Sequence, residues 1–184
     1  MISEFINEWF NAHRAEVIAW RRHIHRHPET ANQEVETTNF LASILQDYGL
    51  EPQRFPQTGL MVDIGPDTEL GRLAFRADID ALPVTEVTGL EYTSEVPGKM
   101  HACGHDVHTS AVLGAALALK RHEEQLEQMR TAVRFIFQPA EEVVPGGAHN
   151  VIDENALDGV DRVFAVHCDP QIDVGTVGLA VGPV

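Results

Sequence analysis

Cysteine and positive charge are both scarce in this chain of 184 residues. Only two cysteines occur, Cys103 and Cys168, and this count excludes a fold that depends on a disulfide framework. Lys and Arg number 13 against 28 Asp and Glu, so the formal net charge is -15. General repulsion of that size argues against nucleic acid or an anionic membrane as a partner. A small-molecule substrate fits this charge better.

Long apolar runs are also missing. The longest stretches, such as AVLGAALAL, fall far short of the roughly eighteen residues that a membrane-spanning helix needs. The N-terminal MISEFINEWF is acidic where a signal peptide would be basic, so we expect a cytoplasmic protein. An apolar content of 43% and a mean hydropathy of -0.14 are ordinary for a globular domain. Because no repeat or linker interrupts the chain, we expect residues 1–184 to form one domain.

Helical and strand-like patterns alternate along the sequence. Apolar spacing predicts helices at Ser3 to His27, Gln33 to Tyr48, Val107 to Lys120 and Gly147 to Asn155. Runs rich in β-formers predict strands at Gly59 to Ile64, Arg72 to Ala77, Thr131 to Gln138 and Arg162 to His167, the last one buried, and an edge hairpin in the closing GTVGLAVGPV. The Pro- and Gly-rich stretch from Asp78 to Asp106 predicts an ordered functional loop, with Asp106 as the N-cap of the next helix. This order predicts an α/β fold with an open sheet.

Metal-binding and acidic side chains follow three of the predicted strands. Asp78 and Asp80 follow FRA, the adjacent Glu141 and Glu142 follow FIFQ, and His167 ends FAVH. Parallel strands deliver such residues to one edge of a sheet, where ligands bind in open α/β folds. The loop that carries Cys103 and His105 is long enough to reach that edge. The sequence therefore predicts one site built from distant segments.

The spacing within the motifs suits a metal centre. Thiolate, imidazole and carboxylate groups bind zinc or manganese. In Cys103-Gly104-His105 a turn at the glycine lets both outer side chains face one ion. Adjacent carboxylates point in different directions, so one of Glu141 and Glu142 can bind metal while the other addresses an activated water.

Each feature also has an ordinary structural explanation. A pair of glutamates is usually a solvated helix start, a strand-end histidine is usually a hydrogen-bonded core residue, and Asp-x-Asp is commonly a turn. Cys168 is expected to be a free thiol, which could pair with Cys103 if the metal were lost. His23 and His27 lie one helical turn apart in a segment rich in Arg and His. A positively charged helix end on the surface explains this segment better than a metal site does.

Four strings in series resemble one family. HRHPETANQE, FRADIDALPVTEVTGLEYTSEVPGKMHACGHDVHT, FQPAEEVVPGGAHNVI and VFAVHCDP are similar to the metal-dependent amidohydrolases of the carboxypeptidase G and aminoacylase family, in its hippurate hydrolase-like branch. The resemblance implies a catalytic domain like that of the zinc exopeptidases, with a mostly parallel mixed sheet flanked by helices. It also implies two divalent ions, with zinc, manganese, cobalt and nickel all compatible with the ligand types.

The resemblance assigns a role to each candidate residue. The implied metal ligands are Cys103, His105, Glu142 and His167. Glu141 matches the general base and Asp80 a supporting carboxylate. Asp78 is a further candidate to which the resemblance gives no definite role. In the implied reaction, hydroxide generated at the metals attacks the amide of an N-acyl amino acid and Glu141 passes the proton to the departing amine. Hippurate, aminobenzoyl-glutamate and indole-acetyl-amino acids are the substrate types of that branch.

The chain departs from the family pattern at its end. Family members continue beyond the position of Val184 with a smaller domain for dimerisation and substrate cover, and then with a last ligand histidine. The resemblance therefore predicts that residues 1–184 are a partial catalytic domain, without the lid domain and final segment, of a parent that forms a homodimer. The alternative is an inactive product that folds, binds metal weakly and acts only through association.

Overall fold

The computed structural model describes residues 2–66 and 71–178. The elements, in chain order, are α1 (Ile2–Arg26), α2 (Val35–Asp47), β1 (Gln53–Arg54), β2 (Leu60–Ile64), β3 (Arg72–Asp78), α3 (His105–Arg121), α4 (Glu123–Met129), β4 (Ala132–Gln138), α5 (Ala148–Asp153) and β5 (Val160–Ala165). The helices and strands expected before the closing hairpin are present, and the short elements α4 and β1 are additional. No helix in these ranges is long and apolar enough to cross a membrane.

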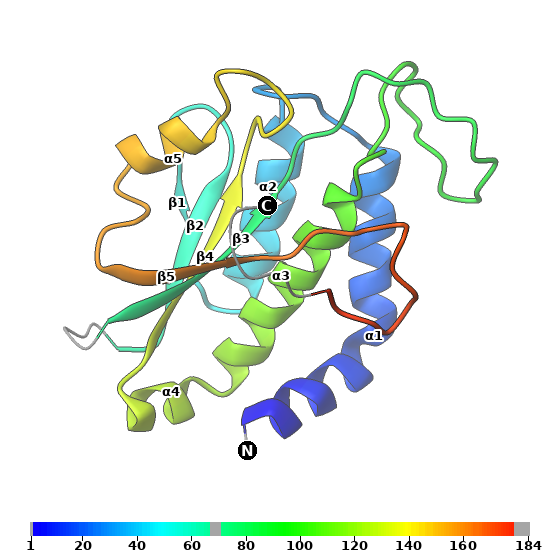
Figure 1. Ribbon diagram of the computed structural model, residues 1–184. Helices are drawn as coiled ribbons and strands as arrows, with labels where there is room; N and C mark the ends of the chain where they lie inside the picture. Colours follow the sequence, from blue (N-terminus) through cyan, green and yellow to red (C-terminus); the bar gives the residue numbers. More distant parts are fainter. Residues whose placement is uncertain (1, 67–70, 179–184) are drawn as a thin grey trace.

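The described residues form a five-stranded sheet in the order β1-β2-β4-β3-β5. β3 pairs in parallel with β4 and with β5, while β2 is antiparallel to β4 and β1 to β2. The prediction of an open, mixed α/β sheet flanked by helices is confirmed. Because β3, β4 and β5 share one direction, their carboxyl ends meet at the same edge of the sheet, as Figure 1 shows.

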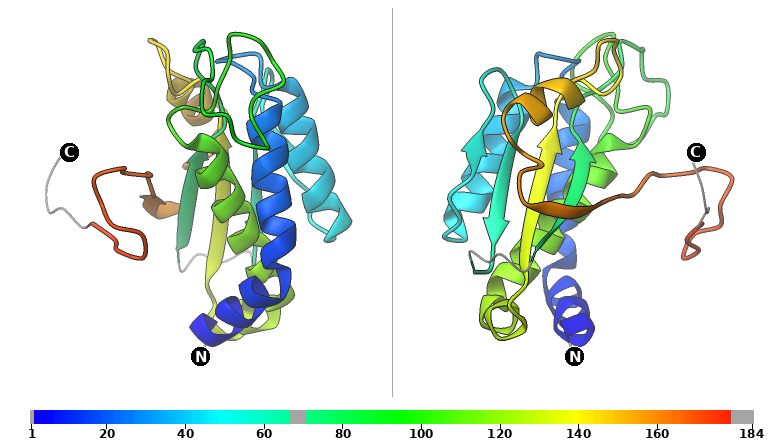
Figure 2. Two further views of the ribbon diagram at one scale, coloured as in Figure 1. Left: turned by 90° about the vertical axis from the view of Figure 1, so that its right-hand side faces the viewer. Right: turned by 60° about the vertical axis from the view of Figure 1, so that its left-hand side comes forward.

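Helices α1, α2 and α3 lie on one face of the sheet, and α5 lies toward the other face (Figure 2). The alternation of side chains along β4 explains both contacts. Phe135 and Phe137 enter the core beneath the three helices, whereas Ile136 packs with Val151 of α5. Residues on both sides of β4 are buried, as expected for a central strand.

Phe135 anchors the larger core, and its removal should be costly. The side chain is fully buried and stacks on Phe75, with ring centroids 5.7 Å apart. We expect Phe135→Ala to lower the free energy of unfolding by about 3–5 kcal/mol, because a cavity replaces the ring. The control is Val87→Ala at a site that is 91% exposed, where we expect a change below about 0.5 kcal/mol. Urea denaturation measures both, and equal values for the two variants would contradict this view of the core.

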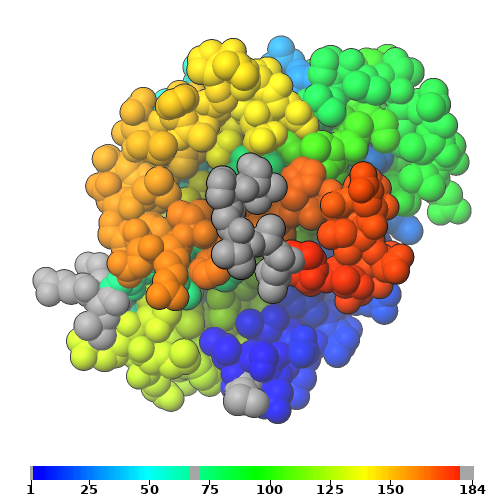
Figure 3. All heavy atoms as spheres, in the orientation of Figure 1, coloured from blue at the N-terminus to red at the C-terminus, as the bar shows by residue number. Residues whose placement is uncertain are grey.

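The last strand differs from the prediction. It begins at Val160 and ends at Ala165, not at Arg162 and His167, and it is exposed where a buried strand was expected. Val163 and Phe164 are 50% and 46% exposed, because β5 is the last strand in the order and pairs only with β3. The following chain, orange to red in Figure 3, lies on the surface of the molecule. The expected hairpin is not formed by residues 175–178, and residues 179–184 lie outside the described ranges.

The start of α3 corrects a second prediction. Asp106 is not the N-cap, because the helix begins at His105 and Gly104 occupies the cap position. Asp106 lies in the first turn, and its Oδ2 accepts hydrogen bonds from Arg21 and His25 of α1. His25 is only 3% exposed and also bonds Glu86. The end of α1 is therefore not a purely solvated charged surface: its His25 side is buried against the loop before α3.

Candidate metal centre

The carboxyl edge of the parallel strands brings together the predicted groups. β3 ends at Asp78, β4 ends at Gln138 three residues before Glu141, and β5 ends two residues before His167. Register pairs Asp78 with Gln138, so the segments that follow β3 and β4 start side by side. The loop from residue 79 to 104 returns to this edge, where it presents Cys103 and then enters α3 at His105.

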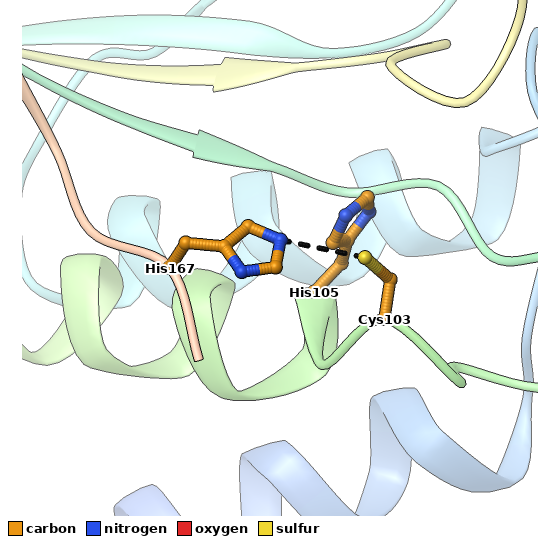
Figure 4. A group of neighbouring side chains, drawn as sticks. All are labelled: Cys103, His105 and His167. Atoms are coloured by element: carbon orange, nitrogen blue, oxygen red, sulfur yellow. Dashed lines mark hydrogen bonds between the residues drawn. The ribbon is translucent and has the colours of Figure 1, made fainter. Parts of the chain in front are cut away.

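Cys103, His105 and His167 form a compact cluster (Figure 4). The Sγ of Cys103 lies 3.4 Å from Nε2 of His167, and one ligand atom from each of the three residues lies within 4.8 Å of the others. Gly104 makes this arrangement possible, because its φ of 86° is left-handed and turns the chain between the two neighbouring side chains. The predicted turn at this glycine is present.

Glu141 and Glu142 face the same imidazole. Nε2 of His105 lies 3.7 Å from Oε1 of Glu142 and 3.9 Å from Oε2 of Glu141. The side chain of Glu142 is 21% exposed, whereas that of Glu141 is 40% exposed. The adjacent carboxylates thus both approach the cluster but differ in environment, because Glu141 is the more exposed of the two.

Backbone carbonyls orient both imidazoles. Nδ1 of His105 donates to the carbonyl oxygen of Asp80 at 2.9 Å, and Nδ1 of His167 donates to that of Cys168 at 2.8 Å. Since a carbonyl oxygen only accepts, Nδ1 of each ring carries a proton, and in the neutral form of the ring the unprotonated nitrogen is Nε2, which faces the cluster. A hydrogen-bonded Nδ1 with a free Nε2 is the usual arrangement of a metal-binding histidine.

Two buried atoms in the cluster fit a cation. Nε2 of His105 and Oε1 of Glu142 have no hydrogen-bond partner among the described residues, and buried polar atoms rarely remain unpaired. Burial, helped by the hydrogen bond and charge of Glu142 and the charges of Asp78 and Glu141, raises the pKa of the Cys103 thiol to about 12. Divalent cations would offset this accumulation of negative charge and deprotonate the thiol on binding.

Asp80 connects the two motifs. Its Oδ2 accepts the backbone N–H of Glu142 at 2.9 Å, and its Oδ1 lies 3.4 Å from Nδ1 of His105. The carboxylate is buried, which raises its pKa, but the bonds from His105 and the backbone outweigh burial and the net pKa is lowered. This geometry is that of a group that orients His105 and Glu142.

His108 was not among the residues predicted for the site. It lies one turn after His105 on the same face of α3, which was a usable signal in HACGHDVH. Its Nδ1 lies 2.7 Å from Oδ1 of Asp78, and the group Asp78, His105 and His108 is spaced for a metal. Both ring nitrogens of His108 are already hydrogen-bonded within the protein. His108 therefore reads as a supporting residue and not as a ligand.

Glu34 was also not predicted as a residue of the site. Its fully buried carboxylate accepts the N–H of Ala140 at 2.8 Å and the hydroxyl of Thr58 at 2.7 Å. Ala140 has a φ of 52° and directly precedes Glu141, so Glu34 holds the turn from which the glutamate pair projects. Burial raises the pKa of Glu34.

The pair His23 and His27 is separate from this centre. Their rings lie 4.5 Å apart between centroids, His23 also stacks on Phe40, and neither belongs to a candidate metal group among the described residues. The structure gives no support to a metal site at this end of α1.

Asp78 should stabilise the metal-free protein in a pH-dependent way. Burial disfavours its charge, but the bond from His108 and the charges of His105 and Arg76 lower its pKa to about 2 from 3.8. A carboxylate whose pKa is lowered by folding stabilises the folded protein at any pH above its ordinary pKa. This contribution, about 2 kcal/mol, is lost as the pH falls from about 4 to about 2. We expect the difference in unfolding free energy between chelated wild type and Asp78→Asn to be constant above about pH 5 and to shrink as the pH falls from about 4 to about 2. A constant difference would contradict this.

Comparison with known proteins identifies the family. Residues 74–182 match the model described as Peptidase family M20/M25/M40. The chain is 46% identical over 170 residues to an N-acetyl-L-cysteine deacetylase of Bacillus subtilis, covering 92% of this chain and 40% of the relative. It is 40% identical over 185 residues to an N-acyl-L-amino acid amidohydrolase of Geobacillus stearothermophilus, covering 100% of this chain and 49% of the relative.

A solved structure agrees with the sequence matches. A dinuclear metal-binding peptidase of family M20 from Bacillus subtilis superposes with a TM-score of 0.87 at 42% identity, covering 94% of this chain and 48% of that one. The chain spans between 21% and 49% of the length of the first curated relatives it matches. With the family model matching more than half of its residues, the chain belongs to peptidase family M20/M25/M40.

Proposed function

We propose that this chain carries the metal centre of an amidohydrolase that cleaves N-acyl amino acids. The observation that supports this most is the approach of Cys103, His105, His167 and the Glu141–Glu142 pair within two overlapping groups of ligand atoms, each spanning no more than 4.8 Å. The names of the relatives, an N-acyl-L-amino acid amidohydrolase and an N-acetyl-L-cysteine deacetylase, support the substrate class. Hippurate, aminobenzoyl-glutamate and indole-acetyl-amino acids remain predicted substrates from the sequence resemblance.

Four residues would hold two divalent ions in this proposal, and the dinuclear relative supports that number. The proposed ligands are Cys103, His105, Glu142 and His167. Zinc and manganese suit this mixture of thiolate, imidazole and carboxylate, and cobalt and nickel are compatible with it. Such ions, when bound, lower the pKa of a water and polarise the amide carbonyl of the substrate.

Glu141 would act as the general base. Its greater exposure leaves the carboxylate free to meet water and substrate, while its backbone neighbour Glu142 is held by Asp80. In this role Glu141 takes a proton from the attacking water and then delivers it to the nitrogen of the departing amino acid. Asp80 is the proposed positioning carboxylate, and Asp78 contributes through His108. The products are a carboxylic acid and a free amino acid.

The test is chelator-sensitive release of amino acid. Purified protein is supplied with Zn²⁺ or Mn²⁺ and offered N-acetylcysteine, hippurate, aminobenzoyl-glutamate and an indole-acetyl-amino acid, and the free amino acid is measured. We expect release from at least one compound, its loss on chelation and its return on adding metal. Release that persists after all metal has been removed would refute a metal-dependent reaction.

A second candidate function is that the chain binds metal weakly, catalyses nothing and acts only by associating with other chains. Two tightly held ions with turnover support the first proposal, whereas one loose ion without turnover supports the second. The homodimer predicted for a longer parent stays a prediction.

A further inference from the structure

The ring of His108 is enclosed between three separate segments. It is 1% exposed. On one side Nδ1 lies 2.7 Å from Oδ1 of Asp78, at the end of β3. On the other side Nε2 lies 2.8 Å from the backbone nitrogen of Cys168, after β5. His108 therefore links helix α3 to the ends of two strands.

The two partners fix the tautomer of the ring. The N–H of Cys168 can only donate, so Nε2 of His108 must accept and the ring proton must lie on Nδ1. That proton is donated to the carboxylate of Asp78, whose other oxygen accepts from Nη1 of Arg76 at 2.9 Å. The orientation of the ring is thus set from the sheet side, and its acceptor points toward the backbone of residue 168.

The segment that carries His167 has few other attachments. After Ala165 the chain leaves the sheet without regular structure, and Val166, His167 and Cys168 are exposed. Cys168 meets the rest of the molecule at Gly104, where an added Cβ would lie 3.2 Å from the Cβ of Cys168. The ring of His167 lies 4.7 Å from that of His108 between centroids. The bond from Cys168 N–H to His108 is the backbone hydrogen bond that docks this segment on α3.

We propose that His108 is a positioning residue for the metal ligand His167. Its Nε2 holds the peptide of Cys168, and the carbonyl of that same residue accepts Nδ1–H of His167, so the ring of His167 turns its Nε2 toward Cys103. This inference rests on the proposed function, in which His167 binds metal. Partners that orient ligating histidines in this way are worth about 10–100-fold in metal affinity.

Two substitutions at His108 separate its two bonds. His108→Asn places an amide nitrogen near the position of Nδ1 and keeps a donor for Asp78, but it offers no acceptor to Cys168. His108→Gln reaches the position of Nε2 with an amide oxygen and keeps the acceptor, but it loses the bond to Asp78. A positioning role through Nε2 predicts that His108→Asn weakens metal binding more than His108→Gln does.

The experiment measures binding of Co²⁺ to the protein and the visible spectrum of the bound ion. We expect His108→Asn to weaken the affinity about 10–100-fold and to change the spectrum, and His108→Gln to restore most of both. The control Thr109→Val removes a neighbouring buried bond, from Oγ1 to the carbonyl of Asp78 at 2.8 Å, and should leave the spectrum unchanged. Equal losses of affinity in His108→Asn and His108→Gln, or wild-type affinity and spectrum in His108→Asn, would overturn the proposal.

A second measurement needs no variant. Long-range ¹H–¹⁵N spectra of the wild-type histidine rings should show His108 protonated at Nδ1 alone, and protonation at Nε2 would overturn the proposal even if His108→Asn failed to fold. The outcomes also separate the two proposals. Wild type that binds no ion contradicts the proposed function, whereas wild type that binds ions while His108→Asn binds them equally contradicts only the role of His108.

Discussion

Replacing Glu141 with Gln should lower kcat for amide hydrolysis by about 10²–10⁴-fold while metal content stays at the wild-type level. Gln keeps the size of the side chain but cannot take a proton from water. The Glu141 carboxylate is 40% exposed and lies 3.9 Å from Nε2 of His105. It can therefore contact a water at the cluster, although it does not close the cluster off from solvent. Steady-state kinetics and metal analysis of the same sample measure the two effects.

The neighbouring glutamate provides the matched control. Glu142 is less exposed, and its buried Oε1 is among the unpaired atoms of the cluster, so we expect Glu142→Gln to lose metal together with activity. The assignment of base and ligand would be reversed if Glu141→Gln lost the metal and Glu142→Gln retained it. Wild-type kcat in Glu141→Gln would end the proposal that Glu141 is the base.

Substitution of His105 should have the largest effect on metal binding. His105 is the one residue shared by all three candidate ligand groups, and its Nε2 is buried without a hydrogen-bond partner among the described residues. We expect His105→Ala to weaken binding of divalent ions by more than about 100-fold, beyond the loss typical of supporting residues. Calorimetric titration with Zn²⁺ or Mn²⁺ measures this.

His23→Ala is the control for that prediction. His23 also belongs to a histidine-rich segment, but it is exposed and stacks on Phe40 and His27. Its substitution should leave the affinity for divalent ions within experimental error. A loss of affinity in His23→Ala comparable with that in His105→Ala would mean that ions bind at the end of α1.

The strand ends were the part of the site that sequence patterns could locate. FRA and FIFQ each precede a candidate group and FAVH ends in one, and parallel pairing of β3 with β4 and β5 brings those groups to one edge. This inference needed only local β-propensity and a general rule for α/β sheets. It did not depend on the precise bounds of the strands, so the two-residue shift of β5 left the predicted meeting point of the groups unchanged.

Local sequence patterns could not predict the exposure of a strand or the contacts between residues far apart in the chain. An apolar run such as RVFAVH reads alike on a central and an edge strand, so the exposure of β5 could not be foreseen. Asp106 stands two residues after Gly104 at the start of a helical pattern, a place that suits an N-cap as well as a first-turn acid. Its partners Arg21 and His25 lie more than eighty positions away, and only the folded chain reveals them.

We propose that Cys103, and not Cys168, supplies a thiolate to a metal held with His105, His167 and Glu142. Cobalt bound to a thiolate gives a sulfur-to-metal charge-transfer band in the near ultraviolet, and the two cysteines of this chain provide a matched pair of variants. The most direct test is the absorption spectrum of the Co²⁺-loaded protein with Cys103→Ser and with Cys168→Ser. We expect the band in wild type and Cys168→Ser and its loss in Cys103→Ser; a band that survives Cys103→Ser, or is absent from cobalt-loaded wild type, would contradict this assignment.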